Sequence, residues 1–251
     1  MRDNRELFTD KAEDYARFRP SYPAAAVEWL RERSSGGAVA DIGAGTGIFT
    51  RLLQGRFAPI CAVEPNAAMR EAFRRFLPDI PCLDGSGECT GLPEGSVDLI
   101  TVAQAFHWLD EELFKREARR ILRKNGKVAI VWNSCLKNEF TLARDEVCQK
   151  YCPRFRAGHA GKRSAAEGDA FLREVYFSEV EVCSFENPFV MDRSAFLGNM
   201  RSRSYALAPG DAGFSRFETE LEKVFDRFSE NGVVTEPQRT EIYLGRFDRS
   251  A

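Results

Sequence analysis

Residues 38–50 read AVADIGAGTGIFT, an apolar run followed by glycine at every second position. The run 38–42 predicts a strand buried on both faces, and the glycines predict a loop directly after it. One or two glycines would suffice to turn the chain. Three of them, Gly43, Gly45 and Gly47, indicate a backbone that passes so close to another group that a Cβ atom would be in the way.

Further strand-length apolar runs follow this one and alternate with helical patterns. One predicted helix is capped by Asn66 and stopped by Pro78, and a second is capped by Asp110 and ended by Asn125 and Gly126. This alternation predicts a mostly parallel sheet with helices on both faces, whose ligand site lies at the carboxyl ends of the strands. The predicted strands are 59–63, 80–83, 97–103, 127–132, 179–185 and 240–247.

The C-terminal half carries fewer regular patterns. Residues 139–152 and 214–228 read as helices, and 153–168 as an exposed loop with several basic side chains.

The composition is that of an ordinary globular protein, with 251 residues, 43% of them hydrophobic, and a net charge of −2. No apolar run approaches the roughly 20 residues of a membrane helix, and the charged N-terminus is unlike a secretory signal. Without a basic excess we do not expect a nucleic-acid partner. The seven cysteines are scattered, which favours reduced thiols over disulfides or a metal site and predicts a cytoplasmic protein.

Two classes of ligand compete for the glycine loop. A dinucleotide-binding loop needs its third glycine one residue later, where Ile48 stands. Asp41, just before the turn, would repel a pyrophosphate but suits a ligand with a positive charge.

The segment DIGAGTG at 41–47 resembles the first motif of the class I methyltransferases that use S-adenosylmethionine (SAM). YARFRPSYP at 15–23 and AFHWLD at 105–110 are similar to the trans-aconitate methyltransferase-like subgroup, known as methyltransferase type 11. The resemblance implies a Rossmann-like α/β fold, with a mostly parallel seven-stranded sheet, helices on both faces and an antiparallel last strand. It continues in AVEPN at 62–66, GSGECTGLP at 85–93, SVDLITVAQAFHW at 96–108 and LRKNGKVAIVW at 122–132.

The resemblance also implies a single methyltransferase domain over residues 1–251. Its expected parts are an N-terminal SAM-covering segment at 1–37, a SAM-binding core at 38–135, a variable acceptor-binding region with one core strand at 136–239, and the last strand with the C-terminus at 240–251.

By position, the resemblance implies cofactor roles around the glycine loop. Asp41 is expected to reach the amino group of SAM directly or through water. Glu64 is expected to bind both ribose hydroxyls and, facing an empty cleft, to support little of the core; the alternative is a charge that favours the next helix. The complete set of expected cofactor residues is Tyr15, Arg19, Tyr22, Asp41, Gly43, Ala44, Gly45, Gly47, Glu64, Pro65, Met69, Ser86, Gly87, Glu88, Ala103 and Gln104.

The N-terminal residues Tyr15, Arg19 and Tyr22 allow two interpretations. They fold over SAM, with Arg19 holding its carboxylate, or they only pack the first helix. His107 is the candidate catalytic residue as a general base, although we favour a role in the pocket wall.

Acceptor binding is expected from residues beyond the motifs. The stretch NMRSRSY at 199–205 places guanidinium groups beside an aromatic ring, which suits a carboxylate; the alternative is a solvated basic helix face. The candidates are Trp108, Trp132, Asn133, Arg201 and Tyr205.

The sequence thus predicts a SAM-dependent methyltransferase that acts by in-line displacement on a small-molecule acceptor, for which a carboxylic acid is one candidate. The alternatives are a methyltransferase for RNA or protein, with 153–168 as a docking surface, and a SAM-binding regulatory protein without catalysis. We expect SAM as the cofactor, no metal, no membrane, and a monomer or homodimer.

Overall fold

The computed structural model describes residues 12–34, 36–156, 159–160 and 163–247, and its centre is a seven-stranded sheet in the order β3-β2-β1-β4-β5-β11-β8. Neighbouring strands are parallel except β11, which runs antiparallel to β5 and β8. The predicted sheet, with its antiparallel last strand, is therefore confirmed. The strands are β1 (Val39–Ile42), β2 (Ile60–Val63), β3 (Cys82–Leu83), β4 (Val97–Ala103), β5 (Leu122–Cys135), β8 (Glu179–Glu186) and β11 (Gln238–Arg246).

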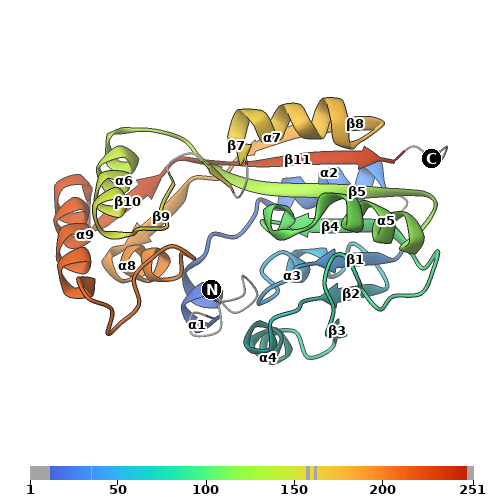
Figure 1. Cartoon of the computed structure of the whole chain (residues 1–251), viewed down its shortest axis with the longest axis horizontal. Coiled ribbons are helices and arrows are strands. Elements are labelled where there is room, and N and C mark those ends of the chain that lie inside the picture. Colours follow the sequence, from blue (N-terminus) through green and yellow to red (C-terminus); the bar gives the residue numbers. More distant parts are fainter. Residues whose placement is uncertain (1–11, 35, 157–158, 161–162, 248–251) are drawn as a thin grey trace.

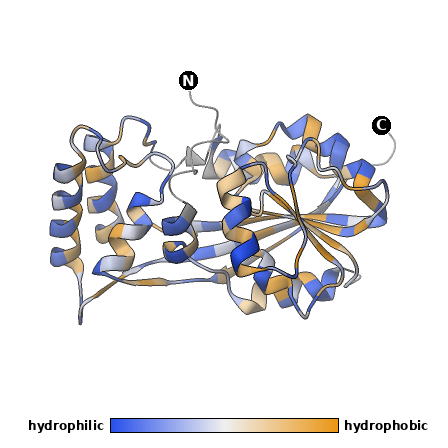
Figure 2. Ribbon diagram, turned by 90° about the horizontal axis from the view of Figure 1, so that it is seen from below, coloured by the Kyte–Doolittle hydropathy of each residue, from blue (hydrophilic) through white to orange (hydrophobic). Residues whose placement is uncertain are grey.

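Helices cover both faces of this sheet, because alternate strand residues point to opposite sides. On β1, Ala40 belongs to the apolar layer that includes Phe114 of α5, whereas Val39 belongs to the layer that includes Leu30 of α2. Figure 2 shows the apolar strands running through the middle of this layered core. The surrounding elements are α2 (Ala24–Arg33), α3 (Thr50–Leu53), α4 (Ala67–Phe76), the short 3-10 helix η3 (Phe106–Trp108), α5 (Glu111–Ile121), α7 (Ala165–Phe171) and the π-helical turn η4 (Leu172–Tyr176).

Residues 136–156 and 187–237, which we call the lobe, form a second packed unit at the end of the long strands β5 and β11 (Figure 1). The lobe has its own apolar core, to which Phe140, Phe196 and Phe217 contribute. The strand β8 lies between the two lobe segments in the sequence but belongs to the central sheet. The lobe elements are α6 (Glu139–Tyr151), β9 (Phe189–Asp192), α8 (Arg193–Arg201), α9 (Phe214–Phe228) and β10 (Val233–Glu236).

The N-terminal helix α1 (Ala12–Phe18) lies between the lobe and the sheet (Figure 1). Its last residue packs so tightly on α8 that a Cβ atom at Gly198 would lie 2.2 Å from the Phe18 ring. The Asn199 side chain donates a hydrogen bond to the Phe18 carbonyl at 2.9 Å. Helix α1 is therefore fastened to α8.

Two sequence-based boundaries were wrong. The helix α5 ends at Ile121 rather than at Asn125 and Gly126, because Leu122 already pairs with Val97 and the strand β5 begins there. The segment 153–168 is not one loop, since it contains the pair β6 (His159–Ala160) and β7 (Arg163–Ser164) and the start of α7. By contrast, the Asn66 and Asp110 caps are confirmed, each accepting a backbone N–H three residues on.

Within the described part of the chain, no helix has the length and apolarity needed to cross a membrane.

Candidate functional site

The three glycines of the opening motif all adopt left-handed backbone conformations, with φ of +65° at Gly43, +58° at Gly45 and +88° at Gly47. A Cβ atom would lie 2.6 Å from Ala105 at Gly43 and 2.6 Å from Leu77 at Gly47, so these two glycines pack against the protein itself. At Gly45 the nearest atom would be Cε1 of Tyr15, 3.9 Å away. Gly45 is therefore the glycine with space beside it.

Asp41 is fully buried at the end of β1. Its two carboxylate oxygens accept hydrogen bonds from the hydroxyls of Thr50, at 2.5 Å, and Thr101, at 2.7 Å. Burial raises the pKa of Asp41 to about 6, against the opposite effect of these two hydrogen bonds. The carboxylate thus ties the glycine loop to β1 and β4, and contact between Asp41 and the amino group of SAM, directly or through water, stays a prediction.

Glu64 follows β2 and reaches back to the glycine loop. Its Oε2 accepts a hydrogen bond from the N–H of Gly45 at 2.9 Å, and its Oε1 accepts one from the N–H of Asn66 at 2.8 Å. Burial raises the pKa of Glu64, while the two backbone hydrogen bonds act to lower it. The carboxylate thus lies where a ligand on Gly45 would meet it, and it also supports the start of α4.

The N-terminal residues converge on the same loop. The Tyr15 ring packs against Met69 of α4, and the Tyr22 ring meets Phe49 edge-on at 4.9 Å between centroids. The Arg19 guanidinium lies over the Tyr15 ring, 4.8 Å from its centroid. The structure therefore brings all three predicted residues together, and Met69 is buried beside Tyr15.

The loop after β3 is held in place by two carboxylates, one from the loop itself and one from α5. Glu88 accepts a hydrogen bond from the N–H of Asp110 at 2.8 Å. Glu117 of α5 accepts hydrogen bonds from the N–H of Thr90 at 2.8 Å and from its hydroxyl at 2.5 Å, and pairs with Arg120. The Arg120 contact, followed by those from Thr90, holds the pKa of Glu117 at about 2. The predicted residues Ser86, Gly87 and Glu88 thus sit in a fixed loop.

Beyond β4 the chain turns sharply at Gln104, a non-glycine residue with φ of +57°. Such backbone strain concentrates at functional sites. The Gln104 side chain donates a hydrogen bond to the carbonyl of Asn133 at 2.9 Å, which ties the ends of β4 and β5 together.

His107 lies between two tryptophans, with ring centroids 4.6 Å from Trp108 and 5.4 Å from Trp132. Burial, and then the charge of Arg19, lowers the pKa of His107 to about 4. The imidazole is therefore neutral at pH 7 and a weak base. Its Nδ1 is buried without a hydrogen-bond partner among the described residues.

Two predicted acceptor residues have other partners. Arg201 pairs with Glu218 at 2.9 Å and with Asp14 at 3.7 Å, so it joins α8, α9 and α1. The Asn133 side chain bonds Ser21, Asn187 and Thr240. Arg201 and Asn133 thus have partners within the protein, and acceptor binding by either residue stays a prediction.

Tyr205, the third acceptor candidate outside the tryptophans, packs in the lobe core. Its ring meets Phe155 edge-on at 4.9 Å between centroids, and burial raises its pKa. This packing places the ring among apolar side chains of the lobe, and acceptor binding by Tyr205 stays a prediction.

The sequence did not indicate the charged cluster beneath this region. Arg144 of α6 pairs with Glu236 and with Asp145, and Arg203 lies 3.6 Å from Glu236. Arg203 also donates hydrogen bonds to Asn199. These residues are far apart in the sequence and follow no motif; the only signal was the guanidinium-rich stretch at 199–205, which contains Arg203 as well as Arg201.

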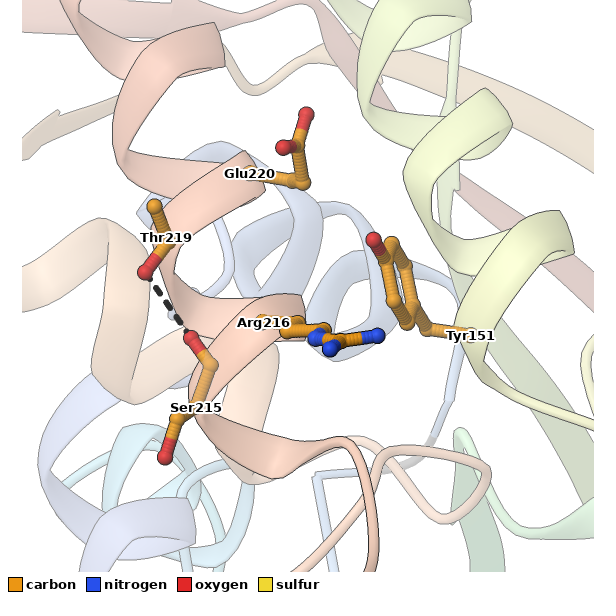
Figure 3. A pocket seen from close by; sticks show the side chains of 5 residues that line it. All are labelled: Tyr151, Ser215, Arg216, Thr219 and Glu220. Carbon is orange, nitrogen blue, oxygen red and sulfur yellow. Dashed lines mark hydrogen bonds between the residues drawn. The ribbon is translucent and has the colours of Figure 1, made fainter.

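A separate depression of about 360 Å³ lies between α6 and α9, and Figure 3 shows its lining. None of the predicted site residues takes part in it. It is lined by Tyr151, Ser215, Arg216, Thr219 and Glu220. In the described part of the chain, no three His, Cys, Asp or Glu side chains are placed to hold a metal ion.

Comparison with known proteins agrees with this arrangement. Residues 40–130 match the family described as a methyltransferase domain. An uncharacterized methyltransferase of Mycobacterium tuberculosis is 41% identical over 120 residues, which are 48% of this chain and 49% of the relative. An uncharacterized methyltransferase-like protein of Schizosaccharomyces pombe is 35% identical over 136 residues, 53% of either chain. The chain spans about half the length of these curated relatives.

Solved structures extend the similarity beyond the matched segment. A protein from Anaeromyxobacter dehalogenans, assigned to the type II methyltransferases, aligns with a TM-score of 0.64 and 26% identity, over 91% of this chain and 96% of its own. The YcgJ protein from Bacillus subtilis shares the fold, with a TM-score of 0.57 and 18% identity over 89% and 99% of the two chains. Residues 40–130 are thus similar to a methyltransferase domain, and the solved structures show that the Rossmann-like fold of methyltransferases extends over most of the chain.

Proposed function

We propose that the protein transfers a methyl group from SAM to a small-molecule acceptor, with a carboxylic acid as the preferred class. The observation that carries this proposal is the environment of Gly45. Its left-handed backbone leaves room for a Cβ atom, the Glu64 carboxylate accepts its N–H, and the Tyr15 ring lies 3.9 Å from the position of that Cβ atom. This is a cradle for a flat ligand with hydroxyl groups and a positive charge.

The residues around Gly45 fit SAM, which supplies a methyl group on a positively charged sulfur. Each oxygen of the Glu64 carboxylate accepts one backbone hydrogen bond and retains capacity for a ribose hydroxyl. Tyr15 and Tyr22 would cover the cofactor from the N-terminal segment. The fixed loop at Ser86, Gly87 and Glu88 would meet the adenine edge.

Methyl transfer requires alignment and a dry site more than it requires a covalent nucleophile. The rings of Trp108 and Trp132 on either side of His107 supply an apolar wall near the end of β4. A neutral His107 adds to this wall without bringing a charge. The acceptor would enter between this wall and the lobe.

The basic segment 153–168 gives little support to a macromolecular acceptor. Arg163 pairs with Glu111 and stacks on Phe171, 3.8 Å from the ring centroid. Arg156 donates hydrogen bonds to the carbonyls of Pro153 and Phe155. These guanidinium groups are engaged locally, whereas phosphate binding needs them exposed. Of the two remaining cations in this segment, Arg154 is exposed and Lys162 lies outside the described residues.

The test is a transfer assay with SAM labelled in its methyl group, offered with pooled small acids, small amines, RNA and peptides. We expect label in the small-acid pool. Label only in RNA or peptide would replace the acceptor class. If calorimetry showed SAM binding but no pool received label, the protein would be a SAM-binding protein without catalysis.

A further inference from the structure

The buried charges at the junction of α1 and the lobe do not balance. Three guanidinium groups, of Arg19, Arg144 and Arg203, gather near two carboxylates, of Glu236 and Asp145. Arg144 pairs with both carboxylates, and Arg203 lies near Glu236. Arg19 forms no ion pair with any residue that the structure describes, so one positive charge lacks its counterpart.

Arg19 is held in place by contacts that do not neutralise it. One terminal nitrogen donates a hydrogen bond to the carbonyl of Ser202 at 3.1 Å, and the guanidinium lies over the Tyr15 ring. Its Nε is buried without a partner in the described structure. Burial, and then the nearby charge of Arg203, lowers the pKa of Arg19 to about 10. A partly buried cation whose Nε is buried without a partner is costly unless an anion binds it.

His107 belongs to the same environment. The charge of Arg19 is, after burial, the second cause of the low pKa of His107, so the two groups lie near each other. The Nδ1 of His107 is also buried without a described partner. A neutral imidazole can place its proton on Nδ1 and donate it. Two buried nitrogens, one of them on a cation, therefore lack a partner in the described structure, and a ligand with acceptor oxygens would supply one once the side chains that cover them shift.

We propose that Arg19, with His107 beside it, binds a carboxylate of the methyl acceptor and thereby selects anionic acceptors. This inference rests on the proposed function, and it assigns Arg19 to the acceptor rather than to the carboxylate of SAM. The reason is the position of Arg19: its hydrogen bond goes to Ser202, and Arg203 is the charge that lowers its pKa most, both in the lobe. The cradle at Gly45 is instead contacted by Tyr15 and Glu64.

The test separates the two carboxylates by binding. The Arg19→Gln variant and the wild type are titrated with S-adenosylhomocysteine, the demethylated product of SAM, which retains the carboxylate. The saturated proteins are then titrated calorimetrically with succinate and benzoate, each beside its neutral amide. Arg17→Gln, which changes an exposed arginine in the last turn of α1, two residues before Arg19, is the matched control.

We expect the wild type and Arg17→Gln to bind at least one carboxylate probe and neither amide. Arg19→Gln should lose about tenfold or more in affinity for that carboxylate, because hydrogen bonds to charged groups are the strong ones. Its affinity for S-adenosylhomocysteine should stay within about threefold of wild type. Arg19→Lys keeps the positive charge but lacks the planar guanidinium group, so its affinity for the carboxylate should lie between those of wild type and Arg19→Gln.

Two results would overturn the inference. The first is a loss of S-adenosylhomocysteine binding in Arg19→Gln with unchanged carboxylate binding, which would assign Arg19 to the cofactor. The second is a wild-type protein that binds the amides as tightly as the carboxylates, or that binds neither carboxylate. This second result does not depend on whether any variant folds. Failure of the proposed function looks different: the wild type itself would not bind S-adenosylhomocysteine or would transfer no methyl group.

Discussion

The carboxylate of Glu64 accepts the backbone N–H of Gly45, with 2.9 Å between oxygen and nitrogen. This contact joins the end of β2 to the middle of the glycine loop, and the second oxygen of Glu64 accepts the N–H of Asn66. The side chain is only 7% exposed. The expectation that Glu64 supports little of the core therefore does not hold, since the carboxylate shapes the loop before any ligand arrives.

Glu64→Gln tests both roles at once. The amide can accept only one of the two backbone N–H groups, so a buried donor loses its partner at a cost of about 1–3 kcal/mol. We expect a lower melting temperature without ligand and a SAM affinity weaker by roughly one to two orders of magnitude. Thermal unfolding and calorimetry of one preparation measure both quantities. Unchanged SAM affinity together with lower stability would leave Glu64 a purely structural residue.

The glycines of the loop are expected to separate folding from binding. Gly47→Ala places a Cβ atom 2.6 Å from Leu77, so it should lower stability by about 2–4 kcal/mol. Gly45→Ala meets no atom closer than 3.9 Å, and should lower stability by only about 1 kcal/mol but SAM affinity by tenfold or more. Gly91 has φ of +75°, and a Cβ atom there would have no other atom within 4 Å. Gly91→Ala therefore measures only the cost of placing alanine in a left-handed backbone conformation. Equal SAM affinities for Gly45→Ala and Gly91→Ala would contradict a ligand at Gly45.

The sequence was informative where local chemistry decides the structure. Apolar periodicity and the Asn66 and Asp110 caps predicted the central strands and helices, because burial and capping act within one element. The same reasoning placed the glycine loop and Glu64 together, since parallel strands end at one edge of a sheet, whereas only the family resemblance placed Tyr15 there.

What the sequence could not supply was the pairing of side chains from distant segments. Arg201 and Arg203 are equivalent in the motif NMRSRSY, yet Arg201 faces Glu218 while Arg203 faces Glu236. Which of the two arginines lies beside Glu236 depends on how α8 and β10 are arranged in the folded protein. For Asp41, no pattern indicated that the hydroxyls of Thr50 and Thr101 would donate to its two oxygens.

Glu117→Gln should weaken the protein in a pH-dependent way. The carboxylate has a folded pKa of about 2, below the ordinary 4.5, so its contribution is complete above pH 4.5 and disappears as the pH falls toward 2. At pH 7 we expect a loss of about 1–3 kcal/mol relative to wild type, because hydrogen bonds to a charged group are lost. Urea unfolding at pH 7 and at lower pH checks this, with the exposed Glu112→Gln on the same helix as the control. A difference independent of pH would assign the effect to packing.

Asp41→Asn should show the opposite dependence. The folded pKa of Asp41 is about 6, above the ordinary 3.8, so ionisation of this carboxyl costs stability as the pH rises through this range. The asparagine cannot ionise, and its amide can still bond the two threonine hydroxyls. The stability of Asp41→Asn relative to wild type should therefore improve by about 1–3 kcal/mol between pH 4 and pH 7.5. If the stability difference between Asp41→Asn and wild type were the same at both pH values, the pKa of Asp41 would not be raised by folding.

Gly198→Ala should loosen α1 from the lobe. The new methyl group would lie 2.2 Å from the Phe18 ring, so one of the two helices must move. We expect a lower melting temperature and weaker binding of S-adenosylhomocysteine, because Tyr15 on the same helix would leave Gly45. The double variant Phe18→Ala with Gly198→Ala removes the clash and should recover part of the loss. Additive effects of the two substitutions would show that they are not coupled.

The three strands that lead into the lobe also limit how the molecule can open. Cys135 of β5 pairs with Gln238 of β11, and Asn187, just past β8, bonds the carbonyl of Gln238. A swing of the lobe about this neck would have to bend three hydrogen-bonded strands together, which is far stiffer than bending a single linker. We therefore expect the lobe to keep its position relative to the sheet when a small molecule binds.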